Sequence, residues 1–522
     1  MTKRLRFLVN DRIVETEAWE GSPALDFIRG KLELPGTKEG CREGDCGACA
    51  VLLGERGPEG GRYRAVPSCL LALGEAEESH IVTIEGLSSA ASGGINPVMQ
   101  AILGENASQC GFCSPGFVVA LTSFLLAGPP LTVEGAVAAV EGNLCRCTGY
   151  AAILRAAERL IERFADLPAD FRRRVEALEK AEVVPPSLGA FLRGELLAPA
   201  SGAFASPGSG RASAGAGAAS RGASAAEAGG GAAPEGESGR GAILRLGGGT
   251  DFFVRNPDPE ALRDAAGGEY PRVSLVDRKA ELRHVRRLVV DGSERLQVGA
   301  ALSWTDFFAD PELRAAVPGI ESHESKLASI LVRNRATLGG NVANASPVAD
   351  LTSMLVALGA SAGLEAADGS RRELPLERLF LGYKRLDLRA GEFIAYFAIP
   401  IATSERRFNF EKASKRANLD IAAVNTACSF ELSGGRIASA RISAGGVAPT
   451  PLYLEKTSAS LAGTVPDAAT AAAAAALALT EVSPIGDVRG SADYRRRVLE
   501  RLVLAHFIQC FPEKRLEEEL LP

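Results

Sequence analysis

The sequence has 522 residues, of which 46 % are hydrophobic and 23 % are charged, and its formal net charge is -6. This length exceeds what one hydrophobic core serves and predicts about three domains, while the acidic balance argues against a general nucleic-acid binder. No apolar run reaches the ~20 residues of a membrane-spanning helix, and the N-terminus lacks the apolar core of a signal peptide. We therefore expect a cytoplasmic protein without membrane or nucleic-acid partners, whose close cysteines bind metal or do redox work rather than form disulfides.

Residues 1–88 are predicted to form a small α+β domain. Short runs of alternating or continuous apolar residues, bounded by turn residues, are typical of strands, and one longer run has helical spacing. The expected strands are 4–10, 12–18, 48–54, 61–66 and 80–86, and the expected helix is 23–32.

Residues 89–168 change to helical periodicity and are predicted to form a four-helix domain. The expected helices are 96–106, 114–128, 132–143 and 150–164. Pro115 and Thr132 suit helix starts, and Gly128 and Gly142 suit helix ends.

Residues 169–241 are predicted to be a connector. Its second part, from 198 onward, is dominated by Ala, Gly and Ser, with no aromatic residue after Phe204. Such a composition buries too little apolar surface to offset the entropy of ordering, so we expect a flexible linker. Strand-like and helix-like runs alternate after it, which predicts two further α+β parts over 242–400 and 401–522.

The first group of cysteines is Cys41, Cys46, Cys49 and Cys69, with the spacing C-x4-C-x2-C-x19-C. This is the spacing of a plant-type 2Fe–2S loop with one distant ligand. Gly40, Gly44 and Gly47 supply the backbone freedom that a tight loop around a cluster needs. A structural zinc site is the main alternative, although such sites usually use two C-x2-C pairs, and disulfides are a second alternative that the expected compartment disfavours.

The second group is Cys110, Cys113, Cys145 and Cys147, with the spacing C-x2-C-x31-C-x-C. Each pair precedes a predicted helix, and the positive end of a helix favours thiolates and a negatively charged cluster. The eight cysteines thus predict two metal centres of four ligands each. We expect the two remaining cysteines, Cys428 and Cys510, to be buried free thiols.

Two glycine-rich turns stand out in the second half of the chain. They are "LRLGGGTDFF" (244–253) and "RNRATLGGNVANASPVAD" (333–350). Neither matches the G-x-G-x-x-G fingerprint of a nicotinamide-binding Rossmann fold. Clustered glycines still let backbone N–H groups approach a phosphate, and Thr250 and Thr337 add hydroxyl donors. Two such turns suit the two phosphates of a dinucleotide.

At "CREGDCGACAV", "QCGFCSPGFV" and "NLCRCTGY" the chain resembles the iron–sulfur/flavin subunit of the molybdenum hydroxylase family. The resemblance implies two 2Fe–2S clusters, FAD and a partner subunit that holds molybdopterin. It also implies a ferredoxin-like β-grasp domain, a four-helix iron–sulfur domain and a vanillyl-alcohol-oxidase-like FAD-binding domain with an α+β C-terminal lobe. By resemblance, the second cluster lies beside the molybdopterin, which Gln109 and Cys147 would approach, and the first lies toward the flavin.

The resemblance also implies a set of FAD-binding positions, with Asp350 at the adenosine portion, Ile394 packed on FAD and Tyr383 near the flavin ring. For Tyr383 a packing role is an equal alternative, and Lys412 could instead be a solvated charge. The full set is Arg245, Leu246, Gly247, Gly248, Gly249, Thr250, Asp251, Phe252, Thr337, Gly339, Gly340, Asn341, Asp350, Tyr383, Ile394 and Lys412.

No catalytic residues of a hydroxylase are expected in this chain. Its four histidines are scattered along the sequence and make neither a metal site nor a Ser–His–Asp set. We interpret the chain as an electron relay of a xanthine dehydrogenase-type oxidoreductase of purine catabolism, with NAD as acceptor, in a heteromer such as a dimer of heterodimers. The alternatives are the same subunit serving another heterocycle or aldehyde hydroxylase, a self-sufficient NADH or quinone reductase, or an assembly protein that has lost its cofactors.

Overall fold

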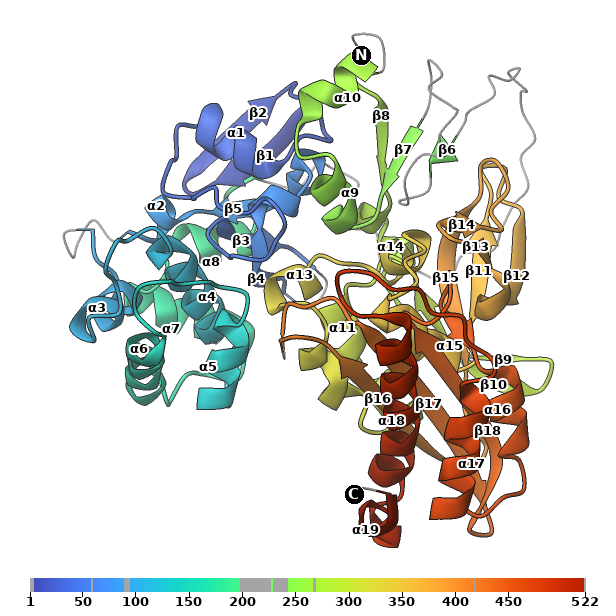
Figure 1. Ribbon diagram of the computed structural model, residues 1–522. Coiled ribbons are helices and arrows are strands. Elements are labelled where there is room, and N and C mark those ends of the chain that lie inside the picture. The colour runs from blue at the N-terminus through green and yellow to red at the C-terminus, as the bar shows by residue number, and fades with distance from the viewer. Residues whose placement is uncertain are drawn as a thin grey trace. The chain divides into compact units, whose positions relative to one another are not determined.

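The computed structural model describes residues 4–57, 60–88, 94–197, 227–228, 243–265, 269–416 and 418–520. The chain divides into two compact units. The first unit comprises Met1–Ala226, Ser238–Ile243 and Pro257–Arg272, and the second comprises Glu227–Glu237, Leu244–Asn256 and Val273–Pro522. Helices and strands of both units are labelled in Figure 1.

The N-terminal part of the first unit is a five-stranded mixed sheet in the order β2-β1-β5-β3-β4, in which only β1 and β5 are parallel. Leu5, Phe7 and Val9 of β1 alternate toward one face, where Phe27 and Ile28 of helix α1 cover them. The elements are β1 (Leu5–Val9), β2 (Arg12–Thr16), α1 (Ala24–Gly30), β3 (Ala50–Glu55), β4 (Arg62–Pro67), β5 (His80–Val82) and α2 (Ile84–Leu87), with 3-10 turns η1 (Ser68–Leu70) and η2 (Leu73–Ala76).

The predicted four-helix domain is present, and helix α4 lies at its centre. α4 contacts α3, α5 and α7 and also strands β3 and β4, so it is buried on most sides. The Thr132 hydroxyl accepts a hydrogen bond from Gly135 N at the start of α5, and Gly128 ends α4 with a φ of 93°. The four helices are α3 (Pro97–Gly104), α4 (Ser114–Ala127), α5 (Val133–Val140) and α6 (Ala151–Arg163).

The first part of the expected connector is regular. Helices α7 (Phe171–Lys180) and α8 (Ser187–Leu192) follow the four-helix domain, and Asp170 caps α7 by accepting a hydrogen bond from Arg173 N. The Arg174 guanidinium donates to the carbonyls of Leu126 and Ala127, which ties α7 to the end of α4. The predicted flexible linker lies outside the described residues, apart from Glu227–Ala228.

The second unit begins with a three-stranded sheet, β6-β7-β8, and a five-stranded antiparallel sheet, β12-β11-β15-β10-β9. Helices α11 to α15 share one hydrophobic core with the larger sheet. The elements are β6 (Glu227–Ala228), β7 (Ile243–Leu246), α9 (Thr250–Arg255), β8 (Arg272–Leu275), η3 (Val276–Arg278), η4 (Ala280–Leu282), β9 (Val285–Val290), β10 (Ser293–Gly299), α11 (Trp304–Ala309), α12 (Pro311–Ala316), η5 (Ile320–Lys326), α13 (Ile330–Arg333), α14 (Leu338–Ala343), α15 (Asp350–Ala357), β11 (Ser361–Glu365), β12 (Arg371–Pro375), η6 (Leu376–Arg378), β13 (Phe380–Gly382), β14 (Arg385–Leu386) and β15 (Phe393–Pro400); α10 (Pro259–Ala265) belongs to the first unit.

The C-terminal part of the second unit is an antiparallel sheet in the order β16-β17-β18-β19. Helices α16, α17 and α18 cover one face of it in Figure 1, and α15 contacts β17 and β18. Leu499, Val503 and Phe507 recur every four residues along α18, and this stripe is buried in the core beside the sheet. The elements are β16 (Glu405–Ala413), β17 (Val424–Ser433), β18 (Arg436–Gly445), β19 (Leu452–Tyr453), α16 (Glu455–Ser460), α17 (Ala468–Ala478), α18 (Ala492–Cys510), η7 (Pro512–Lys514) and α19 (Glu517–Leu520).

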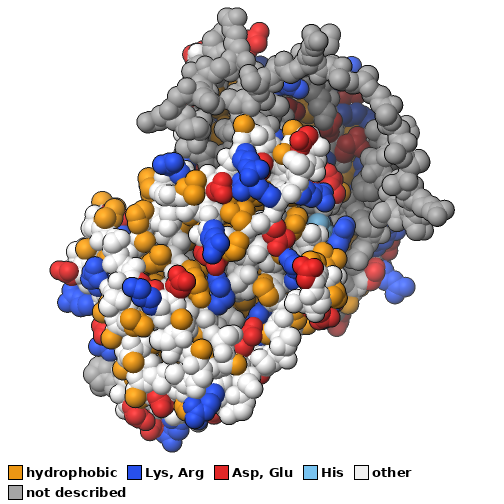
Figure 2. All heavy atoms as spheres, turned by 90° about the vertical axis from the view of Figure 1, so that its right-hand side faces the viewer, with side chains coloured by type: hydrophobic (Ala, Val, Ile, Leu, Met, Phe, Trp, Pro, Cys, Tyr) orange, Lys and Arg blue, Asp and Glu red, His pale blue; other side chains and the backbone are white. Residues whose placement is uncertain are grey.

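The described parts of the chain contain no helix that is both long and apolar enough to cross a membrane. On the face that Figure 2 shows, basic and acidic side chains are interspersed rather than gathered into a field of one sign. The prediction of a multidomain α+β protein is confirmed.

Candidate functional site

The first group of cysteines is assembled by a loop and a strand pair. Cys41, Cys46 and Cys49 lie in the loop between α1 and β3, and Cys69 lies in η1, directly after β4. The antiparallel register of β3 and β4 pairs Ala50 with Pro67, which carries the distant cysteine to the loop. The Sγ atoms of Cys49 and Cys69 are 3.3 Å apart.

The four thiols of this group are arranged as two pairs. A hydrogen bond from Cys46 lowers the pKa of Cys41 to about 5, and a hydrogen bond from Cys69 lowers the pKa of Cys49. Two thiolates on one tetrahedral metal with 2.3 Å bonds are about 3.8 Å apart, so each pair suits one metal ion. Among the described residues no three His, Cys, Asp or Glu side chains converge on a single ion. Two thiolates on each of two irons, as in 2Fe–2S, fit this two-by-two pairing.

The loop needs its glycines for close approach and for turning. A Cβ on Gly40 would lie 2.8 Å from the Sγ of Cys46, so a side chain there would displace a thiol. Gly44 and Gly47 have φ values of 78° and 66°, a region that favours glycine.

The second group has the same paired arrangement. The Sγ atoms of Cys147 and Cys110 are 3.7 Å apart, and Cys113 and Cys145 share a hydrogen bond. Cys113 is the N-cap residue of α4, as the sequence predicted. Cys145 and Cys147, which were also predicted to lie at a helix start, are farther from one, because α6 begins only at Ala151.

One edge of the second site is open. Cys110 and Cys147 are exposed, whereas Cys145 is buried. Gln109, which is also exposed, donates a hydrogen bond from Nε2 to the carbonyl oxygen of Cys147 over 3.2 Å. Gln109 therefore joins the two cysteine segments of this site.

The two glycine turns, far apart in the sequence, are in direct contact. The Thr337 hydroxyl donates to the carbonyl oxygen of Gly247 over 3.2 Å and accepts from Gly340 N over 3.0 Å as the N-cap of α14. A Cβ on Gly248 would lie 2.1 Å from the carbonyl oxygen of Arg335, so the turns pack backbone against backbone. Each turn opens a helix, α9 or α14, and the close approach of the two backbones leaves no room for a side chain at Gly248 or Gly340.

A polar cluster lies beside these turns. Asp251 accepts a hydrogen bond from Asn344 Nδ2 over 2.9 Å and pairs with Arg255 over 3.0 Å. Lys384 Nζ donates to the carbonyl and side-chain oxygens of Asn344 over 2.7 and 2.6 Å. Burial raises the pKa of Asp251 and lowers that of Lys384. Asn344 and Lys384 were not predicted, although Asn344 lies inside the second quoted glycine turn, because their role depends on a contact between distant segments.

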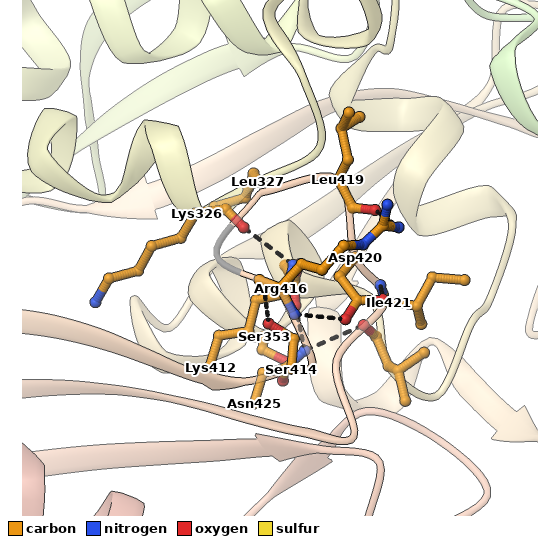
Figure 3. A network of polar contacts seen from close by, with 12 residues as sticks. Lys326, Leu327, Ser353, Lys412, Ser414, Arg416, Leu419, Asp420, Ile421 and Asn425 are labelled. Atoms are coloured by element: carbon orange, nitrogen blue, oxygen red, sulfur yellow. Dashed lines mark hydrogen bonds and ion pairs between the residues drawn. The ribbon is translucent and has the colours of Figure 1, made fainter. Parts of the chain in front are cut away.

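Lys412 and Asp350 form a buried ion pair, and Figure 3 shows Lys412 in the same polar network as Lys326 and Asn425. Lys412 Nζ is 2.7 Å from Asp350 Oδ2 and 3.0 Å from the carbonyl oxygen of Lys326, and its side chain is only 4 % exposed. Asn425 Nδ2 donates to the other oxygen of Asp350 over 2.6 Å. The alternative of a solvated charge at Lys412 is wrong, because the amine is held in the interior. Asn341, in turn, accepts two hydrogen bonds from Thr352.

The remaining predicted FAD positions are dispersed around these turns. The Arg245 guanidinium lies 5.4 Å from the ring of Phe393, and Ile394 is 5 % exposed within the core of the second unit. Tyr383 is 63 % exposed at the tip of the β13–β14 hairpin, so the packing alternative for this residue does not hold. Leu246 is buried and Phe252 is half-buried.

Three protein-family models match the chain. A [2Fe-2S] binding domain matches residues 83–158, an FAD binding domain in molybdopterin dehydrogenase matches residues 274–402, and a CO dehydrogenase flavoprotein C-terminal domain matches residues 409–510. The chain carries the iron–sulfur and flavin domains of molybdenum hydroxylases. The second group of cysteines lies inside the [2Fe-2S] match, and the second glycine turn lies inside the FAD match, whereas the first glycine turn lies outside it. The first group of cysteines lies outside the matched range and rests on its spacing and pairing.

Curated molybdenum hydroxylases are similar over most of this chain. A xanthine dehydrogenase of Drosophila pseudoobscura pseudoobscura is 27 % identical over 88 % of this chain and 35 % of its own length. A xanthine dehydrogenase of Blastobotrys adeninivorans is 29 % identical over 86 % of this chain and 36 % of its own length. The chain thus spans about a third of the relatives that it matches.

Solved structures of related enzymes match part of the chain. A reconstituted CO dehydrogenase from Oligotropha carboxidovorans aligns with a TM-score of 0.46 and 24 % identity, over 52 % of this chain and 90 % of that one. A quinoline 2-oxidoreductase from Pseudomonas putida 86 aligns with a TM-score of 0.45 and 26 % identity, over 52 % of this chain and 90 % of that one.

Proposed function

We propose that this chain is the electron-transfer subunit of a molybdenum hydroxylase, with xanthine dehydrogenase as the favoured activity. In this proposal, electrons from a substrate oxidised at molybdopterin on a partner subunit reach FAD by way of two 2Fe–2S clusters, and NAD⁺ is the acceptor. The clusters supply one-electron chemistry and the flavin converts it to two-electron chemistry, while the protein binds, spaces and insulates them. The observation that carries the proposal is the presence of two paired-cysteine sites and one joined pair of glycine turns in a single chain.

The exposure of the cysteines supports the direction of flow. Cys110 and Cys147 of the second site are exposed, whereas Cys49 and Cys69 of the first are buried. An exposed site is the one that a partner subunit can approach, and a buried site is suited to exchange within the chain. Gln109, exposed and bonded to Cys147, is the residue that we expect at the partner interface.

The proposed FAD site consists of the predicted positions around the two glycine turns. Gly247, Gly248 and Gly340 let the two turns pack closely against each other, and Thr250 and Thr337 lie at the helix starts. Because a helix start presents backbone N–H groups and a positive dipole end, it stabilises a pyrophosphate. We propose that Tyr383 contacts the flavin from the exposed hairpin tip, and that Asp350 and Lys412 act together in shaping the adenosine pocket.

Xanthine is proposed as the substrate because the curated relatives described above are xanthine dehydrogenases. The test is to purify the tagged chain from its native host with whatever binds it, and to measure molybdenum, iron and flavin per chain. The complex is then assayed for NAD⁺ reduction with xanthine, an aldehyde, quinoline and carbon monoxide. Stoichiometric molybdenum and xanthine-dependent NADH formation would support the proposal. A molybdenum-free chain that by itself passes electrons from NADH to a quinone would contradict it.

A further inference from the structure

The loops of the two cysteine groups touch each other within the first unit. Leu144 N donates a hydrogen bond to the carbonyl oxygen of Cys46 over 3.0 Å. Leu144 directly precedes Cys145, so one hydrogen bond connects a ligand residue of the first group to the residue beside a ligand of the second. A path from Cys46 to Cys145 therefore crosses only covalent bonds and this one hydrogen bond.

The side chain of Asn143 fixes this contact. Its Nδ2 donates to the carbonyl oxygen of Gly47, the residue after Cys46, over 3.2 Å, and the side chain is buried, with Asn143 3 % exposed. The backbone N of Asn143 donates to the carbonyl of Val140 at the end of α5, which anchors the residue in the four-helix domain. Two successive carbonyls of the first loop, those of Cys46 and Gly47, are thus held by two successive residues of the second.

Two glycines make this approach possible. A Cβ on Gly47 would lie 2.4 Å from Asn143 Nδ2, and a Cβ on Gly116 in the first turn of α4 would lie 2.3 Å from the carbonyl oxygen of Gly47. Both distances are shorter than real Cβ contacts, so a side chain at either position would force the loops apart.

We propose that Asn143 is a positioning residue for electron transfer between the two metal sites. It holds the Cys46 carbonyl against Leu144 N, and clusters bound at the two sites would exchange single electrons along this path. One iron of the helical-domain site would be oxidised as one iron of the ferredoxin-domain site is reduced, without proton transfer. This inference rests on the proposed iron–sulfur function.

The chemistry of the amide explains why asparagine suits this position. A neutral N–H₂ group can donate to the Gly47 carbonyl without adding charge near two negatively charged clusters. A carboxylate of the same shape could only accept, and its oxygens would repel that carbonyl. Asn143→Asp therefore removes the donor while keeping the size of the side chain.

The first test compares two buried asparagines of the same unit. Asn96 Nδ2 also donates to backbone carbonyls, of Leu87 and Val183, but far in sequence from the cysteine loops. Asn143→Asp and Asn96→Asp are made in the full chain, and iron, labile sulfide and midpoint potentials are measured first. Low-temperature paramagnetic resonance of the dithionite-reduced protein then reports the magnetic coupling between the two sites as a splitting of their signals.

The second test leaves the hydrogen-bonding groups intact. Gly116→Ala pushes directly on the Gly47 carbonyl, whereas a Cβ on Gly104 in helix α3 has only Arg159 near it, at 3.9 Å. Both changes place alanine in a helix, so Gly104→Ala controls for helix propensity. If Asn143→Asp fails to retain iron, Gly116→Ala still tests whether the contact between the loops affects the coupling of the two sites.

The expected result is that Asn143→Asp and Gly116→Ala lose the splitting and slow the transfer between sites, while iron and sulfide content stay at the wild-type level. Asn96→Asp and Gly104→Ala should retain both. Unchanged splitting in Asn143→Asp and Gly116→Ala, or equal loss in the two controls, would overturn the inference. A wild-type chain without molybdenum partner but with coupled iron–sulfur signals would refute the proposed hydroxylase function and leave this inference standing, so the two failures are distinguishable.

Discussion

The hydroxyl of Thr337 lies 3.2 Å from the carbonyl oxygen of Gly247 and thereby joins two turns that are 90 residues apart in the chain. The same hydroxyl caps α14 by accepting from Gly340 N over 3.0 Å. One small side chain therefore both starts a helix and sets the spacing of two glycine turns. Because both turns are proposed to hold the phosphates of FAD, changes at this junction test the cofactor site.

Thr337→Val should weaken FAD binding and lower the free energy of unfolding of the second unit by about 1 kcal/mol, the usual value of a helix N-cap. Thr132→Val is the matched control, because the Thr132 hydroxyl caps α5 of the iron–sulfur domain in the same way, accepting from Gly135 N over 3.0 Å. The measurement is FAD titration followed by flavin fluorescence. Equal FAD affinity in the two variants would contradict the role of Thr337.

Gly340→Val should abolish FAD binding while both iron–sulfur sites remain reducible. A Cβ on Gly340 would lie 2.8 Å from the carbonyl oxygen of Gly247 and 3.0 Å from the Thr337 hydroxyl, so the larger side chain separates the two turns. Gly486→Val is the control, since the atoms nearest to its Cβ are 3.7 Å away or farther. The ratio of flavin to iron in the purified proteins distinguishes the two, and a normal ratio in Gly340→Val argues against a phosphate site at these turns.

Cys46→Ser and Cys113→Ser should each remove one of two distinguishable paramagnetic signals. Wild-type protein should contain four irons and four labile sulfides, about two of each per group of four thiols. Each variant should lose the cluster to which its cysteine is bound. Stoichiometric zinc without labile sulfide, or loss of both signals in either variant, would show that the two groups are not independent 2Fe–2S sites.

Lys412→Met should destabilise the second unit by about 3–5 kcal/mol, because it leaves the carboxylate of Asp350 without its buried cation. Adding Asp350→Asn should recover part of this loss, since the second change removes the uncompensated charge. Urea denaturation of the wild type, both single variants and the double variant gives the coupling energy of the pair. A coupling energy near zero would mean that Lys412 is held by the carbonyl of Lys326 rather than by Asp350.

His323 should make the second unit sensitive to acid. Burial among Phe408 and Phe410, with Lys326 nearby, lowers the pKa of His323 to about 4. In the unfolded chain a histidine has a pKa of about 6.5. Between about pH 6.5 and pH 4, His323 is therefore protonated in the unfolded chain but neutral in the folded chain. Because unfolding takes up this proton, the free energy of unfolding decreases as the pH falls from about 6.5 to about 4.

His323→Leu should remove this sensitivity. Between pH 7.5 and pH 5, the free energy of unfolding of the wild type should fall by about 2 kcal/mol more than that of the variant. The reason is that the variant has no His323 to take up a proton on unfolding. Denaturant unfolding at the two pH values is the measurement. If the free energy of unfolding changes by the same amount between the two pH values in variant and wild type, His323 does not take up a proton on unfolding.

Cysteine spacing and local helix signals were sufficient to predict the iron–sulfur half. Spacing predicted the two groups Cys41–Cys69 and Cys110–Cys147, and Thr132 and Gly128 predicted the start of α5 and the end of α4, because these signals act within a few residues of the chain. The pairing of Cys49 with Cys69 and of Cys110 with Cys147 needed the fold. Cys428 and Cys510 are buried, as predicted, with Sγ atoms 3.7 Å apart.

The sequence by itself determined which residue types could bind clusters and phosphate, because spacing and glycine content are local properties. Only the tertiary structure decided which distant segments meet: Thr337 with Gly247, Lys412 with Asp350, and Asn143 with Gly47. Each of these contacts joins segments more than 60 residues apart, and their partners are selected by the packing of whole domains rather than by neighbouring residues. A charged residue such as Lys412 looks the same in sequence whether it is solvated or buried, and the fold alone supplies the carboxylate that keeps it inside.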